Sequence, residues 1–246
     1  MVLSLSLFCL FFNSNKVFAN NDIDTDRDGV PDKDELNVYF TDLNNPDTDG
    51  DGYKDGDEIV HGFSPYNSAK GARLNKSDTD KDGLSDLLEI QFKTDPRKPD
   101  TDNDGVKDGD AVKQGLNPLN SKEKLPKKIE VNLKKQELNY FLGNIRLGTF
   151  KVSTGKSSTP TPKGNYTITN KSPKAWSKTH SLWMPDWMAL NSGKIGIHEL
   201  PEWPSGKKEG ANHLGTPVSH GCVRLGVGPA KQMYDWAPIG TPVTIY

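Results

Sequence analysis

Cysteine is almost absent from this chain of 246 residues, which contains only Cys9 and Cys222. If the N-terminal segment that carries Cys9 is removed, Cys222 has no partner within the chain, which excludes a disulfide framework. An unpaired thiol in an exported protein is a liability unless its reactivity is used. Cys222 is therefore either a small buried apolar residue or a nucleophile.

Long apolar runs are equally scarce. Residues 2–12 are apolar except for Ser4 and Ser6, and Val17-Phe18-Ala19 follows with the small residues that a signal peptidase requires. This run is too short to span a bilayer but has the length of a signal-peptide core, although no Lys or Arg precedes it. We expect residues 1–19 to be a cleaved export signal, no membrane span in the mature protein, and a location in the periplasm, the cell wall or outside the cell.

The net charge is also small, at −2, but this value is the sum of an acidic N-terminal half and a basic C-terminal half. Residues 20–121 contain 25 acidic and 12 basic residues, whereas residues 122–246 contain 8 acidic and 18 basic residues and all five tryptophans. The acidic half is suited to holding cations, and the basic half contains most of the large core-forming residues. We expect no nucleic-acid partner; the basic half fits an anionic wall polymer.

A twelve-residue frame occurs four times in the acidic half, beginning at Asp24, Asp47, Asp78 and Asp100. Each copy has Asp at positions 1, 3, 5 and 9 and Gly at position 6, and the first three copies end in Glu at position 12. In calcium loops, alternate carboxylates converge on one side of a tight turn, and a Glu at position 12 closes the site. The predicted ligands are Asp24, Asp26, Asp28, Asp32, Glu35, Asp47, Asp49, Asp51, Asp55, Glu58, Asp78, Asp80, Asp82, Asp86, Glu89, Asp100, Asp102, Asp104 and Asp108.

The fourth copy has Ala111 at position 12, so it should bind more weakly or borrow a ligand from Asp110 or from a neighbouring repeat. The alternative for the whole region is a disordered acidic spacer, but a spacer has no reason to keep this pattern in register four times. We expect one short helix after each loop, at 35–40, 58–62, 86–92 and 111–115. Residues 20–120 resemble the thrombospondin type 3 repeats of bacterial surface proteins. The resemblance implies structural Ca²⁺ and either a stiff spacer or an arm that binds other wall components.

The basic half begins after a charged linker, residues 121–127, and its pattern predicts a mainly β domain over residues 128–246. Alternating residues and turn signals predict strands at 129–133, 138–142, 145–152, 165–169 and 242–246, with one short helix at 229–236. A rigid Pro-containing loop, 159–164, and a long Gly- and Pro-rich loop, 201–217, separate some of these elements.

Four motifs of this half occur in the order typical of one enzyme family. They are VSTGK…TPTPKG at 152–164, WMPDWMAL at 183–190, IGIH at 195–198 and SHGCVRL at 219–225. On these motifs, residues 128–246 resemble an L,D-transpeptidase catalytic domain, a β-sandwich fold that cross-links or tailors bacterial peptidoglycan.

The resemblance implies a role for each motif residue, with no cofactor for catalysis. Cys222 would be the nucleophile and His198 its general base, because a thiolate beside an imidazolium can attack an amide near neutral pH. His220 and Gly221 would shape the oxyanion site, where backbone N–H groups need open access. Glu199, where the family commonly has Gly or Ser, leaves three options open: its carboxylate points to solvent, orients His198 or meets a substrate amine. The candidate substrate-binding residues are Arg224, Ser219, Trp183 and Met184.

By this resemblance, the substrate is the tetrapeptide stem of peptidoglycan, and the acyl group held on Cys222 passes to an amine of another stem in a 3→3 cross-link. If water accepts the acyl group, the enzyme is an L,D-carboxypeptidase, and if a protein amine does, it is an anchoring enzyme. Two other classes remain open. One is a non-catalytic calcium-dependent wall-binding or adhesion scaffold, and the other is a cysteine peptidase that cleaves all-L peptides.

Overall fold

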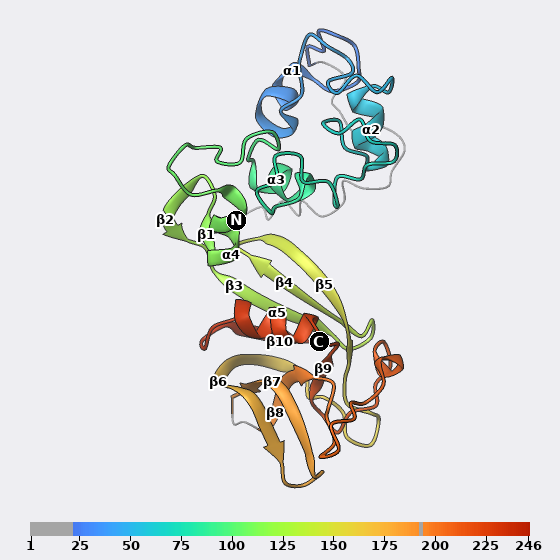
Figure 1. Ribbon diagram of the computed structural model, residues 1–246, viewed down its shortest axis with the longest axis vertical. Helices are drawn as coiled ribbons and strands as arrows, with labels where there is room; N and C mark the ends of the chain where they lie inside the picture. Colours follow the sequence, from blue (N-terminus) through green and yellow to red (C-terminus); the bar gives the residue numbers. More distant parts are fainter. Residues whose placement is uncertain (1–21, 192–193) are drawn as a thin grey trace, which may run out of the picture. The chain divides into compact units, whose positions relative to one another are not determined.

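The structure is a computed structural model that describes residues 22–191 and 194–246. The chain forms two compact units, one ending at Glu123 and the other running from Lys124 to Tyr246 (Figure 1). The predicted export signal, residues 1–19, lies outside the described residues. Within the described part, no helix combines the length and the apolar character needed to cross a membrane.

A short helix begins within the last part of each of the four acidic loops of the N-terminal unit. These helices are α1 (Asp32–Asp34), which continues as the π-helix η1 (Glu35–Tyr39), α2 (Asp55–His61), α3 (Asp86–Phe92) and α4 (Asp108–Gln114). Each helix begins at position 9 of its loop, so three of them start earlier than the sequence pattern predicted. An Asp in the first helical turn interacts favourably with the helix dipole, which explains this earlier start.

A two-stranded sheet of β1 (Leu116–Asn117) and β2 (Asn120–Lys124) closes the N-terminal unit. The sequence analysis had assigned most of β2 to a linker, because its residues are polar and carry no apolar alternation. Charged side chains are tolerated here because four of the five residues of β2 are exposed. The interior of this unit contains carboxylates as well as apolar side chains, and Glu35, Asp55 and Glu89 are all 0% exposed.

The C-terminal unit is mainly β, as predicted. Its strands are β3 (Lys127–Asn132), β4 (Glu137–Leu142), β5 (Ile145–Ser153), β6 (Gly164–Ser177), β7 (Leu182–Leu190), β8 (Ile195–Glu199), β9 (Val223–Leu225) and β10 (Pro242–Ile245). Hydrogen bonding joins them in the order β10-β3-β4-β5-β9-β8-β7-β6, and β6 pairs again with β10. Because β5 and β6 each pair with strands of both layers, the two layers of the predicted sandwich close into one barrel (Figure 1).

The barrel core is filled by branched apolar side chains from alternate strand positions, such as Ile129, Val131 and Val243. The helix α5 (Pro229–Trp236) packs against β7, β8 and β9 and buries Met233. The short 3₁₀ helix η2 (Ala211–His213) interrupts the long loop before β9.

Among the predicted strands, β6 differs most from its predicted length. The sequence analysis placed a strand at 165–169, whereas β6 extends to Ser177 and pairs with β7 along most of its length, up to Ser177 opposite Leu182. The outer half of β6 is polar, so its sequence lacks the apolar alternation of a strand, and the pairing partner stabilises it instead. This extension forms one wall of the site described next.

Candidate functional site

A cavity of about 420 Å³ in the C-terminal unit brings together five predicted site residues, Cys222, His198, His220, Arg224 and Met184. His198 lies on β8 opposite Arg224 of β9, and the two strands run parallel. Residues two apart on an extended chain face the same side, so Cys222, just before β9, shares a face with Arg224. The parallel pairing of β8 and β9 therefore brings the thiol and the imidazole into one cavity.

The ring of His198 is held by the backbone of the next residue. Its Nδ1 lies 2.5 Å from the carbonyl oxygen of Glu199. A carbonyl oxygen only accepts hydrogen bonds, so Nδ1 carries the proton of the neutral ring and Nε2 keeps a free lone pair. Burial lowers the pKa of His198 to about 3, and the positive charge of Arg224 acts in the same direction, against the bond to Glu199. His198 is thus a neutral ring with a defined proton acceptor.

The thiol of Cys222 is also neutral at rest. Burial raises the pKa of this thiol above its ordinary value, while a backbone hydrogen bond from Gly196 and the charge of Arg224 oppose the shift. Gly196 itself is required by space, because a Cβ there would lie 2.6 Å from the ring of Trp187. A neutral thiol beside a neutral imidazole can react once the imidazole takes the thiol proton.

The loop before Cys222 is fixed by hydroxyl groups. Ser219 Oγ donates to the Cys222 carbonyl at 2.6 Å and accepts the Gly221 N–H at 3.1 Å, and Thr161 Oγ1 donates to the Gly221 carbonyl at 2.9 Å. Gly221 has a φ of 117°, a conformation that side chains other than hydrogen rarely adopt. Ser219 is fully buried and does not line the cavity, so its contacts make it a brace of the loop, whereas the exposed His220 lines the cavity.

Two ion pairs fasten the loop 201–217 to the β8–β9 pair. The carboxylate of Glu199 pairs with Lys208, and Arg224 donates to the carboxylate of Glu209. The Glu199 carboxylate is thus buried and paired with Lys208, and the backbone carbonyl of Glu199 contacts the His198 ring in place of the carboxylate. Arg224 lines the cavity, and its Nε has no hydrogen-bond partner among the described residues.

The end of the β6–β7 hairpin forms a wall of the cavity. Met184 lines the cavity, but Trp183 does not; its ring packs edge-on against Trp176, with the ring centroids 4.8 Å apart. Trp176 lines the cavity in its place, and the ring of His180 lies 4.4 Å from that of His220.

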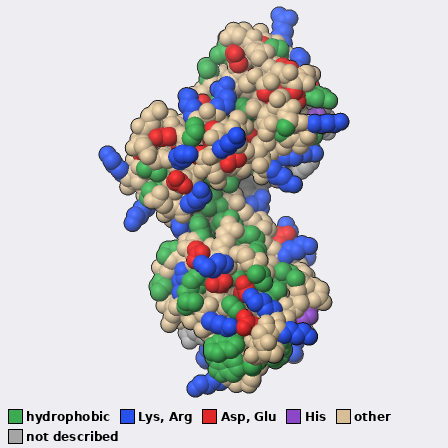
Figure 2. Space-filling model, in the orientation of Figure 1, with side chains coloured by type: hydrophobic (Ala, Val, Ile, Leu, Met, Phe, Trp, Pro, Cys, Tyr) green, Lys and Arg blue, Asp and Glu red, His purple; other side chains and the backbone are tan. Residues whose placement is uncertain are grey.

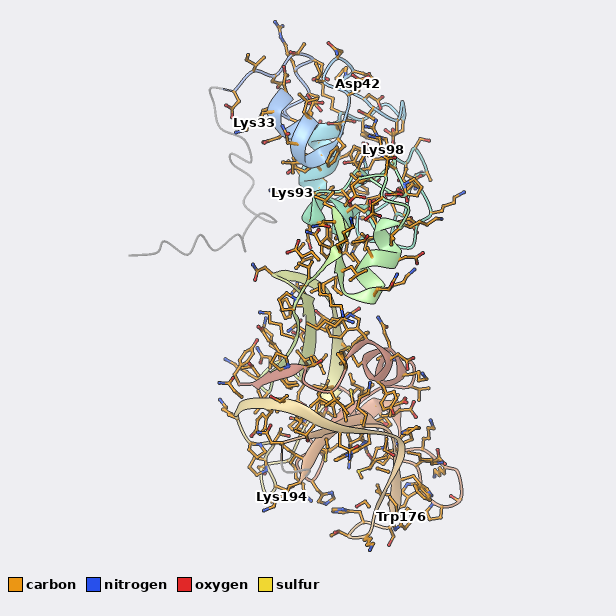
Figure 3. All side chains as sticks on the ribbon, turned by 90° about the vertical axis from the view of Figure 1, so that its left-hand side faces the viewer. Lys33, Asp42, Lys93, Lys98, Trp176 and Lys194 are labelled. Carbon is orange, nitrogen blue, oxygen red and sulfur yellow. The ribbon has the colours of Figure 1, made fainter. Side chains whose placement is uncertain are left out.

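Several lining residues were missed by the sequence analysis, namely Trp176, Lys178, His180, Trp187 and Lys194. Trp176 and Lys194 project at the same end of the C-terminal unit (Figure 3), and hydrophobic side chains are exposed there in Figure 2. The sequence did contain a signal for these residues: Trp176 and Trp183 stand on either side of a short polar stretch, which is typical of a β-hairpin.

The four acidic loops are loop 1 (24–35), loop 2 (47–58), loop 3 (78–89) and loop 4 (100–111). In loops 1, 2 and 3, one carboxylate oxygen from each of positions 1, 3 and 5 lies within 4.8 Å of the others. The position-6 glycines have φ values between 92° and 102°, as the sharp turn requires. Loop 4 makes the same turn, since Asp100 accepts the backbone N–H of Gly105 at 2.9 Å.

Positions 9 and 12 differ in their contacts. In every loop, the position-9 Asp accepts the backbone N–H and the hydroxyl of the Thr at position 2. The position-12 carboxylates are buried among other carboxylates. Burial, reinforced by these charges, raises the pKa of Glu35 to about 7, of Glu58 to about 8 and of Glu89 to about 10.

The loops fit a bound cation. Buried oxygens of Asp26, Glu35, Asp49, Glu58, Asp80 and Glu89 have no hydrogen-bond donor among the described residues. Carboxylates are buried in this way only when paired or bound to a metal. A hard divalent cation with several oxygen ligands satisfies them, and the donor set suits Ca²⁺.

Comparison with known proteins finds a family match in each unit. Residues 126–245 match the L,D-transpeptidase catalytic domain of the YkuD type, and residues 47–62, 78–99 and 100–121 match the bacterial TSP3 repeat. Loop 1 lies outside the matched segments, although its turn has the same geometry.

Among individual proteins, YciB of Bacillus subtilis, whose name assigns it provisionally to the L,D-transpeptidases, is 32% identical over 124 residues, covering 48% of this chain and 64% of YciB. YkuD of Bacillus licheniformis, similarly named, is 25% identical and covers 52% of this chain and 70% of its own length. The solved L,D-transpeptidase (Yku) from Stackebrandtia nassauensis is 27% identical, with a TM-score of 0.43 over 49% of this chain and 55% of that one. The chain thus spans about two thirds of the length of the curated relatives that it matches.

Proposed function

Because residues 126–245 match the YkuD type of L,D-transpeptidase catalytic domain, we propose that the protein is an exported L,D-transpeptidase acting on peptidoglycan tetrapeptide stems. In the first step, Cys222 Sγ attacks the carbonyl carbon of the third stem residue. The amide C–N bond breaks, D-Ala leaves and the acyl group remains as a thioester on Cys222. An amine of another stem then attacks the thioester, which gives a 3→3 cross-link and frees the thiol.

His198 moves the protons of both steps. Its Nε2 takes the thiol proton as Sγ attacks and gives it to the nitrogen of the leaving D-Ala. In the second step, Nε2 takes a proton from the attacking amine and returns it to sulfur. The bond from Nδ1 to the Glu199 carbonyl keeps the ring in the tautomer that this work needs and supports the imidazolium when it forms.

The oxyanion needs backbone donors close to Cys222. The N–H of Gly221 is already donated to Ser219 Oγ, so Gly221 contributes the shape of the turn, through its positive φ. The backbone of Gly196, which bonds to the Cys222 thiol, and the backbone at Cys222 itself are the groups next to the sulfur.

The charge of the cavity supports an anionic substrate. Lys178, Lys194 and Arg224 line it, and none of the lining residues that the structure describes is Asp or Glu. A stem peptide carries free carboxylates, which fixed cations hold in place. The basic surface of this unit and its aromatic wall at Trp176 therefore suit the wall polymer.

The N-terminal unit would bind Ca²⁺ through the carboxylates of its four loops. Carboxylates fill much of the interior of this unit and repel one another. The bound ions would offset this repulsion and so stabilise the folded unit. The unit would then serve as a stiff spacer or as an arm for other wall components, and the ions would take no part in acyl transfer.

One observation carries the catalytic proposal: a thiol and an imidazole with a free Nε2 line the same cavity. The test is to incubate the reduced, calcium-loaded protein with a purified disaccharide-tetrapeptide and to identify the products by mass spectrometry. We expect a cross-linked dimer and free D-Ala, with neither formed by Cys222→Ala. Tripeptide alone would make the protein an L,D-carboxypeptidase, and wall binding without any turnover would favour the scaffold.

A further inference from the structure

We propose that the four calcium loops work as two pairs, loops 1 and 2 and loops 3 and 4, and that each pair encloses an additional cation site built jointly by both loops. The inference rests on the proposed calcium binding by the loops. It adds two sites at which position 9 of one loop completes a site begun by the preceding loop.

Two buried carboxylate triads are the basis of this proposal. Asp28 and Glu35 of loop 1 lie with Asp55 of loop 2, and in each such triad one oxygen per residue lies within 4.8 Å of the others. The second triad, Asp82 and Glu89 of loop 3 with Asp108 of loop 4, uses the same three positions. Both therefore combine positions 5 and 12 of one loop with position 9 of the next, and all six residues are buried.

Unpartnered oxygens point to a missing ligand in both triads. Glu35 is 0% exposed and its Oε2 has no hydrogen-bond partner among the described residues. Glu89 is also 0% exposed, and neither of its carboxylate oxygens has one. The charges of three carboxylates brought this close repel one another, and a divalent cation with oxygen ligands removes this repulsion.

The backbones of the paired loops approach each other closely. The N–H of Gly56 donates to Asp28 Oδ2 at 3.2 Å, and the N–H of Gly109 donates to Asp82 Oδ2 at 2.5 Å. A Cβ on Gly56 would lie 2.5 Å from the Asp28 carbonyl oxygen, and one on Gly109 would lie 2.6 Å from that of Asp82. Only glycine fits at position 10 of loops 2 and 4.

The junction between loops 2 and 3 is built differently. At this junction the position-9 residue is Asp86, whose carboxylate accepts the hydroxyl of Ser64 at 2.6 Å and also bonds to Thr79. Position 10 of loop 3 is Leu87 instead of glycine. The charges around Glu58 belong to the carboxylates of its own loop, Asp49 foremost. The position-9 carboxylate at this junction thus accepts a second hydroxyl besides that of its own Thr, whereas Asp55 and Asp108 accept only the hydroxyl of their own Thr among the described residues.

This contrast provides a matched test. All four position-9 residues make the same bonds to the Thr of their own loop, so a purely structural role predicts the same effect for each Asp→Asn substitution. We would load the full chain with calcium chloride and count the tightly bound ions by native mass spectrometry. Asp55→Asn and Asp108→Asn should each bind one ion fewer than the parent protein, and the double variant two fewer. Asp32 and Asp86, predicted above as ligands of their own loops, have in this proposal only the structural role of accepting from Thr25 and Thr79. Asp32→Asn and Asp86→Asn should therefore keep the full count.

Gly56→Ala is the second variant, because it keeps every carboxylate and only separates loops 1 and 2. It should also lose one ion, whereas Leu87→Ala, at the same position of loop 3, should lose none. Equal counts for Asp55→Asn and Asp86→Asn, or a full count in Gly56→Ala, would overturn the paired sites. A parent protein that binds no calcium would instead contradict the calcium role of the loops themselves.

Discussion

In the proposed mechanism, acyl transfer depends on two side chains of the cavity, Cys222 and His198. Both were identified from their motifs, because SHGCVRL and IGIH are specific local sequences. Their protonation could not be read from the sequence, since it depends on burial and on the Glu199 carbonyl. Ser219 shows the same limit: its motif marks it as part of the site, but its hydroxyl is used inside the loop.

The neutral state of Cys222 predicts the pH profile of its alkylation. Because its pKa is raised, the thiolate fraction and the rate with iodoacetamide should grow about tenfold per pH unit across the neutral range. The second-order rate should be measured from pH 5 to 9, with Cys222→Ala as the background. A rate that stays level between pH 5 and 7 would indicate a preformed thiolate–imidazolium pair and contradict this assignment.

The orienting group of His198 can be tested by comparing two substitutions. His198→Gln removes the base and should lower kcat by about 10²- to 10⁴-fold. Glu199→Gln keeps the backbone carbonyl that holds Nδ1, so its loss should be less than about tenfold. Steady-state kinetics on a tetrapeptide donor gives both values. A similar loss in the two variants would mean that the Glu199 carboxylate orients the ring.

Among the elements, the β6–β7 hairpin is the one that the sequence analysis predicted least well. The strands β4 and β5 and the helix α5 were predicted within a residue, because each has clear alternation or punctuation. The outer part of β6 is polar and lacks this signal. Lys178 and His180 follow directly after it, so their place in the cavity depends on the pairing of β6 with β7.

The cationic wall of the cavity should act on substrate binding. Lys178→Gln and Lys194→Gln should each raise KM by about two- to fivefold with kcat nearly unchanged, because a carboxylate contact stabilises ground and transition states alike. Added salt should reduce the difference between variants and parent. Lys151→Gln is the control, because Lys151 is an exposed residue of β5 that does not line the cavity. Unchanged KM in both variants would exclude these lysines from substrate binding.

For the molecule as a whole, the division into an acidic and a basic half was visible in the charge distribution, and the structure divides the chain in the same region. The contacts between loops were not visible, because nothing in a single twelve-residue frame indicates that position 9 faces the preceding loop. The glycine at position 10 indicates a contact between loops only when the structure shows that Gly56 lies against the backbone of Asp28.

Removing calcium should lower the stability of the N-terminal unit and leave the reaction of the C-terminal unit nearly unchanged. Each ion that binds only the folded state stabilises it by about 2.7 kcal/mol at a hundredfold excess over its Kd, so a chelator should lower the melting temperature of the N-terminal unit. Acylation of Cys222 should continue at nearly the same rate, because no loop carboxylate lines the cavity. Calorimetry and acylation kinetics, each with and without chelator, check both parts. Loss of acylation on chelation would contradict the structural role of the ions.

The most direct test of the account is the intact mass of the reduced protein during turnover of a disaccharide-tetrapeptide. We predict a transient covalent adduct with the mass of the donor minus D-Ala, located on Cys222 by peptide mapping, absent from Cys222→Ala and discharged by a second stem peptide. A folded, calcium-loaded protein that shows no adduct, or one that carries it on another residue, would contradict the assignment of Cys222 as the nucleophile of an L,D-transpeptidase.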